Sequence, residues 1–168
     1  MTPDAVLPAD IDETPAKGEL PIPYARRMAA AKAAAVAEPG ALVLAADTVV
    51  AVGRRILPKA ETEQEARGSL GLLSGRRHRV HSAITLIDAE GRARHRLATS
   101  VVAFKRLSAE EIDAYLASGE WRGKAGGYAI QGRAEALVRM IAGSWSGIVG
   151  LPLFETRALL QSAGYPLG

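Results

Sequence analysis

The amino-acid sequence predicts an α/β fold in which helices pack around a mixed β-sheet. Two observations indicate it. Apolar runs rich in β-branched residues, such as 42–52, are typical of buried strands. Between such runs, two segments begin with Thr or Ser followed three residues later by Glu, which is the capping box of a helix. The order of strands and helices is mixed, and a length of 168 residues suits one domain.

The chain begins with a segment, 1–21, that we expect to be extended. Its four prolines are too many for a helix, and its apolar residues are too few for a core strand. A helix should follow from Pro23 to Ala37, because this run consists mostly of Ala, Arg, Met and Lys. Pro39 and Gly40 should end that helix.

The strand predicted at 42–52 contains one acid, Asp47, among apolar residues and Thr. An isolated ionised carboxylate is costly to bury. We therefore expect Asp47 at the end of the strand, facing a cleft, a cation or a proton to be moved. A turn-forming Asp is the alternative interpretation.

The remaining segments continue the mixed pattern. They are, in chain order, a strand at 55–57, a helix from Thr62 to about Leu73, antiparallel strands at 77–87 and 92–104, a helix from Ser108, a strand at 136–141 and a helix from Pro152. The segment 119–132 holds five of the seventeen glycines. This density predicts sharp turns or a close approach of the backbone to a ligand.

The composition excludes several classes of function. Without cysteine there is no disulfide, thiolate metal site or cysteine nucleophile. No apolar run approaches the length of about 18 residues that spans a bilayer, so we expect a cytoplasmic protein without a membrane partner. Residues 1–24 carry a charge of −4, which leaves +7 on the rest of a chain whose net charge is +3. Aromatic residues are few, so the basic charge favours a nucleotide phosphate over nucleic acid.

Known motifs exclude further classes and leave a small set of polar candidates. The chain has no Walker loop, dinucleotide fingerprint, nucleophile elbow or paired-histidine metal motif. The three histidines all fall in the hairpin predicted at 77–104, where we expect surface or pairing roles. Acids and lysines at the ends of elements remain, with one glutamine among the glycines: Glu13, Lys32, Asp47, Lys59, Lys124 and Gln131.

These residue types suggest phosphate chemistry. Cleavage of a phosphate bond needs a carboxylate that holds a divalent metal or deprotonates water, and cations that neutralise charge on the phosphate oxygens. Gln131 offers both a donor and an acceptor, as required to read the edge of a nucleobase. Taken singly, each lysine also fits a solvated surface position.

Four motifs give a more specific indication. In order, they are ALVLAADTVV, LSGRRHRV, GKAGGYAIQG and GIVGLPLFET, and together they resemble the Maf family along nearly the whole chain. The resemblance implies an elongated mixed sheet flanked by helices, with two lobes around a central cleft, related to the fold of inosine triphosphate pyrophosphatases. It also implies hydrolysis of dTTP, UTP or modified nucleotides to the monophosphate and pyrophosphate, with Mg²⁺ or Mn²⁺, and a homodimer.

The same resemblance assigns catalytic roles position by position. Asp47 matches the proton acceptor of the family, and Lys59 matches its phosphate-contacting lysine. Lys32 occupies the lysine position on the first helix of this chain. Glu13 would hold the metal together with Asp47.

Substrate-binding roles follow from the resemblance as well. Thr48 and Gln131 match positions that accompany a preference for thymidine and uridine triphosphates. Lys124 would hold phosphate charge. A pocket that hydrogen-bonds the correct base rejects analogues lacking the bonded group.

One departure from the family concerns the beginning of the chain. Family members begin with a strand and a phosphate-binding loop of the form S-x-S-P-R-R, which this sequence lacks. We therefore expect residues 1–168 to form a single Maf-like domain that is truncated at its N-terminus relative to the family. The alternatives to an active enzyme are a catalytically impaired protein that binds nucleotides or other proteins, and a truncated copy of an ordinary enzyme.

Overall fold

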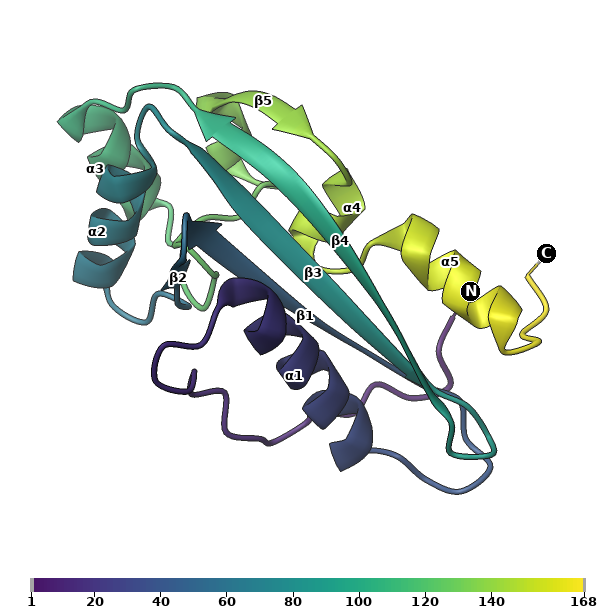
Figure 1. Ribbon diagram of the computed structural model, residues 1–168. Coiled ribbons are helices and arrows are strands. Elements are labelled where there is room, and N and C mark those ends of the chain that lie inside the picture. Colours follow the sequence, from purple (N-terminus) through teal and green to yellow (C-terminus); the bar gives the residue numbers. More distant parts are fainter. Residues whose placement is uncertain (1, 168) are drawn as a thin grey trace.

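The computed structural model of the protein describes residues 2–167, and its centre is a five-stranded sheet (Figure 1). The strands lie in the order β2-β1-β3-β4-β5. Their bounds are β1 Val43–Val52, β2 Arg55–Leu57, β3 Arg77–Ile87, β4 Ala93–Phe104 and β5 Val138–Ala142. β1, β3 and β4 are the long strands, and the strand predictions from 42 to 104 are confirmed to within one residue.

The α/β class is confirmed, but the mixed strand directions expected from the sequence are not found in the sheet. Every neighbouring pair of strands is antiparallel. Hairpins join β1 to β2 and β3 to β4, and strands within a hairpin must run in opposite directions. The parallel pairing within residues 2–167 is a single bridge outside the strands, between Ala60 and Arg122.

The helices follow most of the predicted signals. They are α1 Pro21–Ala35, α2 Glu63–Leu73, α3 Ala109–Ala117, the 3-10 helix η1 Arg133–Leu137, α4 Trp145–Val149 and α5 Leu153–Ser162. The capping boxes at Thr62 and Ser108 are both present. α1 begins and ends two residues earlier than predicted. Residues 2–20 form no helix or strand, as expected from their prolines.

Two short elements were not predicted. η1 takes residues 133–137, so β5 begins at Val138 instead of Ala136. α4 lies in a run of Gly and Ser that is typical of a loop. Its first turn is held by Ser144, whose Oγ accepts a hydrogen bond from Gly147 N at 3.0 Å. This cap therefore stabilises a helix in a segment whose residues have low helix propensity.

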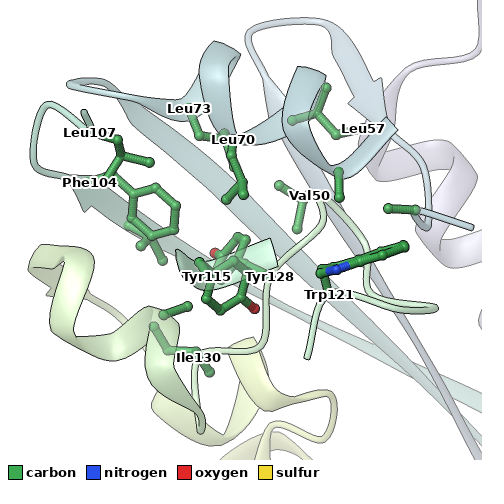
Figure 2. Packing of buried hydrophobic residues seen from close by; sticks show 14 of the residues in the cluster. Val50, Leu57, Leu70, Leu73, Phe104, Leu107, Tyr115, Trp121, Tyr128 and Ile130 are labelled. Carbon is green, nitrogen blue, oxygen red and sulfur yellow. The ribbon is translucent and has the colours of Figure 1, made fainter. Parts of the chain in front are cut away.

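The two faces of the sheet are covered differently. On one face, α1 packs its Ala25, Met28 and Ala29 against Val49 and Ala83. The other face carries two separate apolar cores, and the long strands extend from one to the other. Figure 2 shows the larger core, which joins α2, α3 and the glycine-rich segment around Trp121. α5 covers the smaller core toward the opposite end of the strands (Figure 1).

The three histidines pair with hydroxyl groups in this fold. His78 Nε2 lies 2.8 Å from the Tyr128 hydroxyl, and His81 Nδ1 lies 3.0 Å from Thr99 Oγ1. His95 Nδ1 lies 2.9 Å from its cross-strand neighbour Thr85. These contacts confirm the pairing role predicted for the histidines. No helix within residues 2–167 has both the length and the apolar character needed to cross a membrane.

Candidate active site

Asp47 lies in the middle of β1, which corrects the prediction that it ends the strand. It is 8% exposed, and Ala83 of β3 is its neighbour across the sheet. The carboxylate points to the α1 side, where Lys32 Nζ donates a hydrogen bond to Asp47 Oδ1 at 2.6 Å. The cation compensates for burial of the acid, so a position inside the strand is tolerated.

Four of the charged residues identified in the sequence form one continuous chain of contacts. Lys32 Nζ lies between two carboxylates, 2.6 Å from Asp47 Oδ1 and 2.8 Å from Glu13 Oε1. The second oxygen of Glu13 accepts from Lys59 Nζ at 2.5 Å. The four side chains come from two elements, β1 and α1, and from two segments without regular structure: the residues after β2 and residues 2–20. We call this group the charge cluster.

The charge cluster borders a cavity of about 190 Å³. Glu13, Asp47 and Lys59 supply its charged wall. The other lining residues are Pro15, Tyr24, Thr48, Val49, Ile56, Leu57, Pro58 and Ala125. The cavity is therefore mostly apolar, with its charges gathered at one side, which is the usual composition of a small-molecule site.

The environment shifts the pKa values of the charge cluster in different directions. Burial raises the pKa of the Asp47 carboxyl, and the neighbouring Lys32 ammonium only partly offsets this. Burial also acts to raise the pKa of Glu13, but hydrogen bonds from Lys32 and Lys59 outweigh it, and that pKa is lowered. Burial acts to lower the pKa of Lys32, yet its two carboxylate partners raise it. Asp47 is thus a stronger base than an ordinary aspartate, which suits a proton acceptor.

The structure places the other three candidates differently. The Thr48 side chain points to the opposite face of the sheet from Asp47, since its Oγ1 donates to Ser82 Oγ at 3.1 Å and approaches Gly150 O at 3.4 Å. Lys124 is exposed, but its backbone is joined to the segment after Lys59. Gln131 is exposed and does not line the cavity.

Tyr24 is a site residue that the sequence reasoning missed. It lines the cavity, and its hydroxyl donates to the carbonyl oxygen of Glu13 at 2.6 Å. Tyr24 precedes Lys32 by eight residues, or about two turns, so on a predicted helix the two side chains lie on the same side. That spacing could have indicated Tyr24, but a helical aromatic residue is more often part of a core.

Comparison with known proteins gives a consistent result. A model of the family described as Maf-like protein matches residues 1–163. A protein of Rhodospirillum rubrum named dTTP/UTP pyrophosphatase is 65% identical over 170 residues, covering 100% of this chain and 81% of the relative. Proteins of the same name from Sphingopyxis alaskensis and Paramagnetospirillum magneticum are 61% and 65% identical. The alignments cover 100% and 98% of this chain, and 89% and 88% of the respective relatives.

Proposed function

Because the chain belongs to the Maf family, we propose that it hydrolyses dTTP and UTP to the nucleoside monophosphate and pyrophosphate. The observation that carries the proposal is the charge cluster, in which two carboxylates and Lys59 line one cavity and Lys32 binds both carboxylates. Attack of water on a phosphate requires a carboxylate that accepts a proton and cations that stabilise the charge on the phosphate oxygens.

Asp47 is the proposed proton acceptor. Its raised pKa makes it a better base than an exposed aspartate, and it lies at the cavity wall. Water would lose a proton to Asp47 as its oxygen forms a bond to the α-phosphorus. The bond from that phosphorus to the bridging oxygen then breaks, and pyrophosphate leaves.

The two lysines have unequal surroundings and therefore different proposed tasks. Lys59 is 48% exposed and contacts only Glu13 within the charge cluster, so its ammonium is accessible to a phosphate. Lys32 is 18% exposed and contacts both carboxylates. We assign phosphate binding to Lys59, and the support of Asp47 and Glu13 to Lys32.

Glu13 and Asp47 are the proposed ligands of a divalent metal. Both carboxylates contact Lys32 Nζ, so a metal that binds both of them would lie beside this ammonium or take its place. Mg²⁺ is commonly held by one or two carboxylates together with the phosphates of the substrate. The pair fits such a shared cation, whereas residues 2–167 contain no group of three ligands that could cage a metal alone. When bound, Mg²⁺ or Mn²⁺ would neutralise charge on the phosphate oxygens.

Base selection is assigned to Thr48 and Gln131, and further phosphate contact to Lys124. Because the Thr48 side chain points to the opposite face of the sheet from Asp47, its contact with a base requires the base to reach that face. Support for Lys124 comes from the backbone contacts that join its segment to the cavity-lining Lys59. Gln131 lies outside the cavity, so its contact with a base requires the nucleotide to extend beyond that cavity. Replacing Gln131 with Ala should reduce discrimination among triphosphates more than it reduces the rate with the best one. Equal loss with every triphosphate would count against this role.

Three further proposals concern the whole chain. Residues 1–168 form a single Maf-like domain, the protein is cytoplasmic, and it assembles as a homodimer. Analytical ultracentrifugation of the purified chain tests the last of these directly, and a sedimentation coefficient of a monomer at all concentrations would contradict it.

The decisive experiment measures pyrophosphate release from dTTP and UTP in the presence of Mg²⁺ or Mn²⁺. Asp47→Asn should lower kcat by at least about 100-fold, the usual minimum for loss of a general base. Asp113→Asn is the matched control, because Asp113 is 59% exposed and pairs with Arg67 on the surface. Binding of dTTP without any release would contradict catalysis and favour the non-catalytic alternative.

A further inference from the structure

Glu13 holds a central place in the charge cluster although no regular structure fixes its backbone. It lies within residues 2–20, which form no helix or strand. Its carboxylate nevertheless meets two lysines, at 2.8 and 2.5 Å. A backbone without ladder or helix hydrogen bonds must be held by side chains if such contacts are to persist.

The Tyr24 hydroxyl makes the contact that holds residue 13 itself. It donates to the Glu13 carbonyl oxygen at 2.6 Å. The Tyr24 ring is 9% exposed and packs with Ala25, Met28 and Val49 between α1 and the sheet. A ring fixed in a packed core presents its hydroxyl at a defined position.

Helix α1 therefore holds both the main chain and the side chain of Glu13. Tyr24 binds the main-chain carbonyl, and Lys32, about 12 Å further along the helix axis, binds the carboxylate. Arg27 binds two further residues of the same extended segment. Its Nη2 donates to Thr14 O at 3.2 Å and to the Glu19 carboxylate at 2.7 Å. The extended segment thus lies along α1, and the last turn of the same helix carries Lys32, the partner of Asp47.

We propose that Tyr24 is a positioning residue, whose hydroxyl holds Glu13 so that its carboxylate stays between Lys32 and Lys59. The relevance of this position for catalysis rests on the proposed function; the tether itself does not. Tyr24 touches the main chain of Glu13 and acts on substrate or metal only through that residue. Loss of the hydroxyl lets the carbonyl turn to water, and the carboxylate then spends less time at the lysines.

The substitution Tyr24→Phe isolates the hydroxyl, since the packed ring remains. We expect kcat/KM for dTTP with Mg²⁺ to fall by about three- to tenfold, which corresponds to one net hydrogen bond. Amide hydrogen exchange in residues 9–19 should become faster. Tyr128→Phe is the matched control, because it also removes one buried hydroxyl contact, to His78, in the core on the other face of the sheet. Exchange in residues 9–19 should be unchanged in that variant.

A double-mutant cycle with Glu13→Gln separates positioning from a general structural effect. If Tyr24 acts through Glu13, Tyr24→Phe should cause no further loss of kcat/KM once the carboxylate is gone. An equal loss in both backgrounds would overturn the proposal, as would unchanged exchange in residues 9–19.

Failure of the proposed function gives a different result. In that case the wild-type chain releases no pyrophosphate, while hydrogen exchange still tests the tether. Faster exchange at 9–19 in Tyr24→Phe, but not in Tyr128→Phe, would then support the positioning of Glu13. Equal exchange in the two variants would refute it.

Discussion

The contact between Lys32 and Asp47 can be tested by removing only the cation. In Lys32→Met, the apolar side chain has similar length, and the buried carboxylate loses its nearest partner at 2.6 Å. Breaking a buried ion pair in this way typically destabilises a protein by about 3 to 5 kcal/mol. Because Lys32 is 18% exposed and water partly solvates it, we expect a loss near the lower value, about 3 kcal/mol.

Urea denaturation measures this loss as a shift of the unfolding midpoint. With a slope of about 2 kcal/mol per molar urea, typical of a small protein, the midpoint should fall by about 1.5 M. Lys59→Met is the control, because Lys59 is 48% exposed and its pair with Glu13 should contribute at most about 1 kcal/mol. In the double variant Lys32→Met/Asp47→Asn, the buried charge is gone and most of the stability should return.

The deficit of Lys32→Met should also depend on pH. Burial raises the pKa of Asp47 in the folded protein, and Lys32 opposes that rise. A carboxyl with a raised folded-state pKa favours folding at acidic pH, and this contribution is lost as the pH rises through that pKa. Without Lys32 the pKa rises further, so the deficit should be largest at neutral pH and shrink on acidification.

Two results would refute this reasoning. One is an equal loss of stability in Lys32→Met and Lys59→Met, which would mean that burial of Asp47 is not the source of the cost. The other is a double variant that is no more stable than Lys32→Met.

Three further predictions concern stability and are measured by the same denaturation assay. Gly126→Ala would place a Cβ 2.8 Å from Val50 Cγ1, so it should cost more than Gly123→Ala, which has a similar positive φ but open space; an equal cost would contradict the clash. Leu70→Ala should lower the free energy of unfolding by about 2 to 5 kcal/mol, because Leu70 is fully buried. A smaller loss would mean that the core closes over the space left by the shortened side chain. Thr62→Ala should cost about 1 kcal/mol by removing the cap of α2, and no change would show that Glu65 holds the end alone.

The parts of the fold that were predictable carry their signals within a few residues. The capping boxes at Thr62 and Ser108 each concern hydrogen bonds between residues three apart. α4 was missed because its five residues are too few to show a helical period. The antiparallel pair formed by 77–87 and 92–104 was predicted correctly because a short turn joins the two strands. The directions in the rest of the sheet were missed because pairing there depends on how distant segments return to it.

The residues of the candidate site also include some that the sequence could predict and some that depend on the packing of distant segments. The buried charge of Asp47 indicated a cleft, a cation or a proton to be moved, since the cost of burial is a property of one residue, and a cation is found beside it. The identity of that cation depends on how α1 packs against β1, and nothing in a spacing of fifteen residues shows it. The role of Tyr24 depends on the course of a segment without regular structure. Gln131 was identified from its amide among the glycines and from the resemblance, and it lies away from the cavity.

The two carboxylates of the charge cluster differ in mechanical stiffness. Asp47 is anchored in a long strand whose register with β3 runs without interruption from Val43 to Ala51. Glu13 is attached to the fold by a few side-chain contacts. The carboxylate of Glu13 can therefore adjust its position to a ligand in the cavity, while that of Asp47 keeps its place. Such a site can exchange its contents without disturbing the sheet, and slow amide exchange at Asp47 beside fast exchange at Glu13 would reveal that division.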